Sequence, residues 1–189
     1  MTLKTFLAGT LIAGASVTHA GILAFQTTLG PEVTGATGSG FATVLYDDVE
    51  RILSWSIAFA GLSGTTTVAH FHCCTAAPGT GFVGVAVSPG TLPGFPTGLS
   101  SGTDEGSIDL DLTTSFTNGF RGSDTPQQAA ARFIQGIYDG KNYLNIHTTT
   151  FGGGEIRGFL QVPEPSALLL AGLALAGLAT TSRRRPVTP

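Results

Sequence analysis

The chain has 189 residues, of which 27 are glycine, 10 are proline and only 11% are charged. An ordinary globular domain carries about 25% charged residues. The low charge and the absence of a lysine-rich stretch disfavour a nucleic-acid-binding protein and a cytosolic helical bundle, while the many glycines and threonines favour short strands joined by turns.

The first segment, residues 1–20, is typical of a secretory signal. Lys4 gives a positive start, residues 6–17 form an apolar run, and Ala20 is a small residue at a suitable cleavage position. The run covers about 12 residues, whereas a membrane span needs about 20. We therefore expect a cleaved signal peptide rather than a permanent anchor.

The central segment, residues 21–161, is expected to form one domain. Its five basic and eleven acidic residues give a formal net charge of −6, which disfavours binding to anionic polymers through bulk charge. Apolar residues recur with a period of two: Leu53, Trp55 and Ile57 share one face of a predicted strand. Eight strands are predicted, over residues 22–29, 41–46, 51–59, 66–72, 82–87, 108–112, 142–147 and 155–162. The pattern indicates an all-β, antiparallel β-sandwich of the immunoglobulin or superoxide-dismutase type.

One short helix is predicted within this domain. Asp124 or Thr125 can cap its start, Pro126 suits its first turn, and Gly140 suits its end. Four apolar residues recur at helical spacing and should pack on the sandwich: Ala130, Phe133, Ile134 and Ile137. Residues 88–106 are rich in proline and glycine and are predicted to form a long loop. Residues 47–50 are predicted to form the turn of a hairpin.

The last segment, residues 162–189, combines a Pro-Glu-Pro motif, an apolar run and an arginine cluster. These are Pro163, Glu164 and Pro165, then residues 166–181, then Arg183, Arg184 and Arg185. Sixteen helical residues cover about 24 Å, short of the roughly 30 Å hydrocarbon core. Physical considerations alone therefore predict that this C-terminal hydrophobic helix is a weak membrane anchor. Its arginines would stay on the cytoplasmic side, and the part of the chain before it would be exported.

The order of these parts resembles a PEP-CTERM sorting tail. The resemblance implies a Gram-negative bacterium and transient membrane insertion through the tail. It also implies an inner-membrane intermediate that an exosortase-type membrane protease cleaves near the Pro-Glu-Pro motif. Release or transfer to the cell surface would follow. An ordinary tail anchor is the alternative interpretation.

Three histidines remain once the signal is removed, namely His70, His72 and His147. His70 and His72 are two residues apart on a predicted strand, so their rings project from one face. His147 joins them if its strand is a neighbour. Imidazole is a good ligand for zinc and copper, and three histidines leave an open coordination position. The sequence leaves open either a copper or zinc site or a structural hydrogen-bonding pair.

Cys73 and Cys74 are adjacent in the sequence. Export implies an oxidising compartment, in which two free thiols are unusual. Neighbouring strand side chains point to opposite faces, so a disulfide between them needs a twisted turn. A vicinal disulfide is favoured here; a disulfide with a partner chain and thiolate ligation beside His72 are the alternatives.

Six short motifs follow one another between residues 23 and 161. They are Leu29-Gly30-Pro31-Glu32-Val33, Gly38-Ser39-Gly40-Phe41-Ala42, residues 55–62, Ala69-His70-Phe71-His72, residues 143–148 and residues 153–158. Together they resemble a CHRD domain, the module repeated in the chordin type of extracellular binding protein. The resemblance implies a non-enzymatic structural or adhesive role, with exopolysaccharide or other surface proteins as partners.

Three polar residues within these motifs are candidates for supporting roles. Asn145 and His147 share a strand face, so Asn145 can orient an imidazole. Glu155 and Arg157 also share a face and can pair with one another or with neighbouring polar strands. The alternative is a polar patch that only fixes the register of the sheet.

A looser similarity links the histidine pattern to the copper half of copper–zinc superoxide dismutases, although the zinc ligands and a fourth copper histidine are absent. The sequence has no Gly-x-Ser-x-Gly elbow and no phosphate-binding loop before a helix. Four acids lack a recognised calcium-loop spacing: Asp104, Glu105, Asp109 and Asp111. The sequence therefore predicts a non-enzymatic, exported cell-surface or extracellular-matrix protein, with a copper- or zinc-binding domain as the alternative.

Overall fold

The computed structural model describes residues 21–163, in which eight strands form one antiparallel sheet. The strand order across the sheet is β5-β4-β7-β8-β1-β2-β3-β6. The strands are β1 (Ile22–Pro31), β2 (Ser39–Asp47), β3 (Ile52–Ala60), β4 (Thr66–His72), β5 (Val85–Val87), β6 (Gly102–Asp109), β7 (Tyr143–Thr148) and β8 (Ile156–Phe159). The all-β, antiparallel prediction is confirmed.

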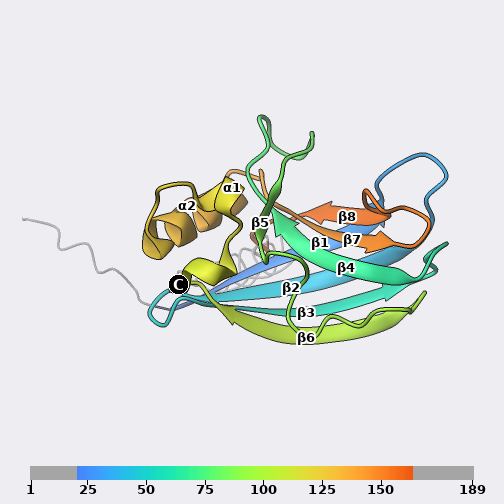
Figure 1. Ribbon diagram of the computed structural model, residues 1–189, viewed down its shortest axis with the longest axis horizontal. Coiled ribbons are helices and arrows are strands. Elements are labelled where there is room, and N and C mark those ends of the chain that lie inside the picture. The colour runs from blue at the N-terminus through green and yellow to red at the C-terminus, as the bar shows by residue number, and fades with distance from the viewer. Residues whose placement is uncertain (1–20, 164–189) are drawn as a thin grey trace, which may run out of the picture.

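The sheet curls so that one half, made of β5, β4, β7 and β8, faces the other half, made of β1, β2, β3 and β6, across a common core (Figure 1). Trp55 of β3 and Phe71 of β4 lie five places apart in the strand order, yet their ring centroids are 6.2 Å apart in an edge-to-face contact. The expected sandwich is therefore built from one continuous sheet whose middle strands, β8 and β1, link the two halves.

Strand β3 shows why these residues form a half-buried sheet. Leu53, Trp55 and Ile57 are buried, whereas Ser56 on the opposite face is exposed. This alternation is the one that the sequence predicts. The β2–β3 hairpin turns at Asp47. Its carboxylate accepts hydrogen bonds from the backbone N–H groups of Val49 and Glu50, at 2.9 and 3.0 Å.

The predicted helix is helix α2 (Pro126–Tyr138), which lies at one end of the sheet (Figure 1). Thr125 caps it and exchanges hydrogen bonds with Gln128 in a capping box. The four residues of the predicted apolar stripe are all buried, and Phe133 packs edge-on against Phe71 with centroids 6.1 Å apart. The structure adds two short elements that the sequence did not predict, η1 (Thr113–Ser115) and α1 (Asn118–Arg121).

The position of β6 was predicted wrongly. The strand begins at Gly102, inside the expected loop, and ends at Asp109, so Leu112 is exposed. The physical reason lies in Trp55 of the neighbouring strand. Gly106 lies under its indole, where a Cβ atom would come within 2.6 Å of the ring, and Asp104 accepts the indole N–H at 2.7 Å. A glycine and an acid therefore occupy positions where the expected pattern has apolar residues.

Strand β5 is also shorter than predicted, since it covers only three residues and leaves Phe82 exposed. The expected signal peptide and C-terminal hydrophobic helix lie outside the described residues. Within residues 21–163, no helix combines the length and the apolar character that crossing a membrane requires.

Candidate metal centre

The three histidines lie together on the outer face of the β4–β7 pair. Ala69 and Phe71 point into the core and anchor β4, so His70 and His72 point away from it. The two strands are antiparallel neighbours, and this places His147 diagonally across from His70. One nitrogen from each ring lies within 4.8 Å of the others, and His70 Nε2 is 2.8 Å from His147 Nε2.

Backbone carbonyl groups fix the orientation of each ring. His70 Nδ1 lies 3.1 Å from Gly90 O, His72 Nδ1 lies 2.7 Å from Val83 O, and His147 Nδ1 lies 2.8 Å from Gly152 O. A carbonyl oxygen only accepts hydrogen bonds, so each Nδ1 carries the proton and each Nε2 presents a lone pair. Metal-binding histidines are commonly held by this kind of outer hydrogen bond.

All three rings are largely buried, and burial keeps those of His70 and His72 neutral near pH 7. Their residues are between 6% and 9% exposed because loops before and after β5 and between β7 and β8 cover them. Burial is the main cause that lowers the pKa of His70 to about 4; the hydrogen bond to the Gly90 carbonyl opposes it, and the neighbouring imidazoles add to it. Burial likewise lowers the pKa of His72. His70 and His72 thus offer uncharged nitrogen donors without first losing a proton.

The arrangement suits a zinc or copper ion with three nitrogen ligands and an open fourth position. His72 Nε2 is buried and has no hydrogen-bond partner among residues 21–163. Tyr143 stacks on the His72 ring at 4.4 Å and limits its movement. Within the described part of the chain, these histidines are the single cluster of three or more potential metal ligands.

Glu32, which the sequence analysis did not single out, lies beside this group. It follows β1, and its carboxylate accepts a hydrogen bond from Asn145 Nδ2 and lies 3.6 Å from Arg157 Nη1. Asn145 therefore does not hold an imidazole in the way we expected. Burial raises the pKa of Glu32, and Arg157 and Asn145 offset only part of this shift. Glu32 stands in the first of the six motifs quoted above, but the motif does not reveal its contacts, because these depend on β1 lying next to β8.

Glu155 and Arg157 do not pair with one another. The fully buried Glu155 carboxylate accepts hydrogen bonds from the Ser63 N–H (2.5 Å), the Ser63 hydroxyl (2.6 Å), the Gly64 N–H (3.2 Å) and the Thr148 hydroxyl (2.6 Å). Burial raises its pKa, but these bonds outweigh burial and leave the pKa below its ordinary value. Arg157 instead donates to Gly81 O at 2.8 Å and lies over three aromatic rings.

Cys73 and Cys74 are bonded to each other in a vicinal disulfide. Both sulfur atoms pack against Gly136 of α2, where an added Cβ would lie 2.8 Å from each. The disulfide thus packs the end of β4 against the helix. Because both sulfur atoms are in the disulfide, neither is a free thiolate ligand beside the histidines. Among the sorting residues, Pro163 ends the described region and the others lie outside it.

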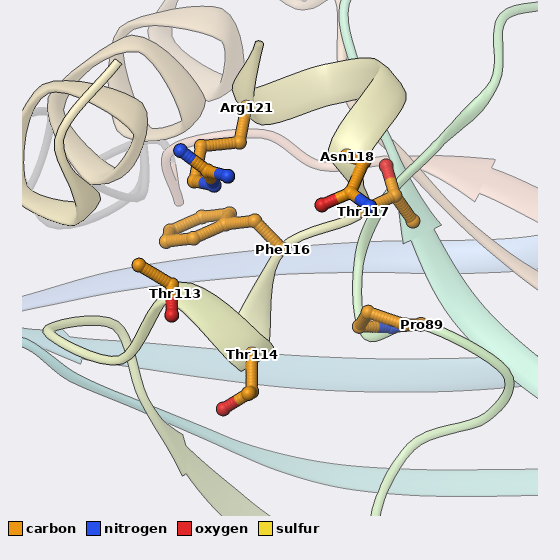
Figure 2. Close-up of a pocket in the computed structure, with 7 residues that line it drawn as sticks. All are labelled: Pro89, Thr113, Thr114, Phe116, Thr117, Asn118 and Arg121. Carbon is orange, nitrogen blue, oxygen red and sulfur yellow. The ribbon is translucent and has the colours of Figure 1, made fainter. Parts of the chain in front are cut away.

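Two other candidate regions lie apart from the histidines. A hollow of about 430 Å³ opens beside η1 and α1, where the Arg121 side chain approaches the Phe116 ring (Figure 2). It shares no residue with the histidine group. The acids considered for calcium do not gather, because Asp104 bonds to Trp55 while Asp111 pairs with Arg51 at 2.5 Å.

Comparison with known proteins gives two matches along the chain. A family model described as the CHRD domain matches residues 22–160. A second model, the PEP-CTERM protein-sorting motif, matches residues 161–185. No curated protein and no solved structure matches the chain.

Proposed function

The chain belongs to the CHRD domain family and carries a PEP-CTERM sorting motif, and on this premise we propose that it is an exported metal-binding protein of the cell surface. In this proposal its domain binds one zinc or copper ion through His70, His72 and His147. The sorting motif indicates an exported protein that an exosortase processes. A tail held in the inner membrane before cleavage, and a final place on the surface or in the extracellular matrix, are part of the proposal.

One observation carries the metal assignment: three Nε2 lone pairs converge, and each ring's Nδ1–H is already used by a carbonyl oxygen. A purely structural His70–His147 hydrogen bond would require a proton on one Nε2. That ring would then be a cation, because its Nδ1 proton is retained. Burial opposes this charge at His70, whose pKa it lowers to about 4. A metal ion satisfies all three lone pairs at once.

The CHRD family is not a known enzyme family, and binding is the activity that this site supports. The structural or adhesive role expected from the sequence, with exopolysaccharide or surface proteins as partners, requires no metal. The two roles are compatible if the ion holds together the loops that cover the histidines. They differ in what happens when the histidines are replaced.

The test is metal analysis of the full chain after export and purification. We expect close to one zinc or copper ion per chain, and loss of that ion in His70→Gln and His147→Gln with the fold retained by circular dichroism. Asp104→Asn is the control, because it changes a buried polar side chain of the β3–β6 pair and supplies no ligand. A well-folded native protein that takes up neither metal on addition would contradict the proposal and leave the metal-free role standing.

A further inference from the structure

Two more buried acceptor atoms lack partners beside the histidine group. They are Glu32 Oε1 and Asn145 Oδ1, which accept no hydrogen bond from residues 21–163; Glu32 Oε1 has Arg157 Nη1 at 3.6 Å, an ion pair longer than a hydrogen bond. The Glu32 side chain and Asn145 are each only 1% exposed. A buried acceptor without a donor costs about 1–3 kcal/mol, so such atoms commonly mark a place where a water or ion binds.

The sheet register places these atoms next to the three-histidine group. Asn145 is paired with His70 on one side and with Arg157 on the other, and it lies two residues before His147 on the same face. Side chains directly opposite in an antiparallel pair have Cβ atoms about 4.5–5.5 Å apart. Asn145 therefore lies directly beside His70 in the sheet, and its amide N–H donates to Glu32.

Gly154 closes this region from the loop between β7 and β8. Its φ is 129°, which side chains rarely allow, and an added Cβ would overlap the Glu32 carboxylate and lie 2.7 Å from Asn145 Oδ1. The backbone thus fits closely over the two acceptors. What lies beneath it must be small.

The charges around the two acceptors select the kind of ligand. Arg157 lies 3.6 Å from Glu32 Oε1, and both Arg157 and a bound metal ion favour the ionised carboxylate. A monoanion on the open metal position would face that negative charge. A water molecule would not, because its oxygen can bind the metal while its two protons supply the missing donors.

We propose that the fourth ligand of the three-histidine centre is a water molecule that donates hydrogen bonds to Glu32 Oε1 and Asn145 Oδ1. This inference rests on the proposed metal-binding function. It makes Glu32 and Asn145 positioning residues that hold water at the centre and exclude small anions. It also predicts an exchangeable coordination site rather than a closed structural one.

The test uses azide binding to the cobalt(II)-loaded full chain, followed through the visible absorption of the metal. Glu32→Gln keeps the shape of the side chain, removes its charge and presents an N–H donor in place of an acceptor. We expect azide to bind the variant at least about tenfold more tightly than the native protein. Asp104→Asn is the matched control, because it removes a buried carboxylate from the β3–β6 pair and should leave azide affinity unchanged.

Equal azide affinity in the native protein and Glu32→Gln, both loaded with cobalt, would overturn the inference and leave a structural water only. Failure of the native protein to bind cobalt, zinc or copper would overturn the proposed function itself, and the inference with it. If Glu32→Gln loses the metal, a measurement on the native protein loaded with copper(II) tests the water ligand instead. Copper(II) resonance lines that broaden in ¹⁷O-water support a water ligand, and unchanged lines overturn it.

Discussion

The two halves of the curled sheet use burial differently. In β3, buried and more exposed residues alternate, because one face meets the core and the other meets solvent. In β7 all six residues are buried, because loops cover the outer face as well. Strands buried on both faces are usually almost entirely apolar. Strand β7 instead carries Asn145 and His147 on its covered face, in agreement with the proposed metal site there.

Unpartnered polar atoms follow the same division. Among residues 21–163, five buried side-chain atoms have no hydrogen bond. Three belong to Glu32, His72 and Asn145, the other two belong to Arg121 and Asn142, and none belongs to β2, β3 or β6. Natural proteins usually tolerate such departures from good packing at functional sites. The comparison therefore distinguishes a regularly packed half from a half that holds the buried polar groups on which the proposed metal site depends.

The largest effect is expected from Ile57→Ala in β3. Ile57 is 1% exposed within the core, and truncating a side chain of this kind typically lowers the free energy of unfolding by about 3–4 kcal/mol. Urea denaturation measures the loss. Metal affinity of the folded fraction should stay the same, because β3 supplies no ligand.

Ser56→Ala on the opposite face of the same strand is the control and should change stability by about 0.5 kcal/mol or less. If Ile57→Ala weakened metal binding in protein that is still folded, the two halves would be coupled. Stability and metal binding would then not be divided between the two halves of the sheet.

The local patterns of the sequence were enough to predict most of the fold. Period-two alternation predicted β3, and a cap followed by a helical stripe predicted α2. The start of β6 was missed because Asp104 and Gly106 fit against Trp55, a neighbour that only the sheet brings close. Contacts of this kind leave no periodic signal.

The candidate site divides in the same way. His70 and His72 share a face because they are two residues apart on one strand, which the sequence shows directly. The sequence predicts His147 beside them only on the condition that β4 and β7 are neighbours, a long-range property that the structure supplies. Glu32 could not be predicted, because it lies 113 residues from Asn145 along the chain.

The second-largest effect is expected at Glu155, in the half of the sheet that carries the histidines. Glu155→Gln should lower the free energy of unfolding by about 2 kcal/mol, because an amide N–H₂ replaces an acceptor that several donors share. Glu155 ties Thr148 at the end of β7 to the chain before β4. Metal affinity should therefore fall together with stability, unlike in Ile57→Ala.

This effect should depend on pH. The pKa of Glu155 is lowered in the folded protein, so its stabilising contribution is complete above the ordinary value of 4.5 and is lost as the pH falls through the folded pKa. The difference in the free energy of unfolding between the native protein and Glu155→Gln should therefore become smaller at acidic pH. Glu105→Gln, at an exposed carboxylate on β6, is the control. A difference that persists at low pH would mean that the hydrogen bonds do not depend on the charge of Glu155.

The smallest effect is expected from Asp104→Asn in the β3–β6 pair. Burial raises the pKa of Asp104 above its ordinary 3.8, and the hydrogen bond from Trp55 Nε1 offsets only part of that shift. The folded state therefore holds this proton more tightly than the unfolded state, and stability falls as the pH rises from 3.8 through the folded pKa. Asparagine keeps an oxygen for the indole N–H and carries no charge. We expect a gain of about 0.5 kcal/mol at pH 7 that disappears near pH 4.

Urea denaturation of both proteins across this pH range measures the gain, with Asp109→Asn on the same strand as the control. A loss of stability at pH 7 would mean that the indole hydrogen bond to a charged oxygen outweighs the burial of that charge. The same reasoning would then apply to Glu32, which is also buried and accepts a hydrogen bond from a neutral group. In that case a negative charge at Glu32 would be stable without a bound metal ion. The two halves would then differ in the number of buried polar groups that they hold, and not in how they hold a charge.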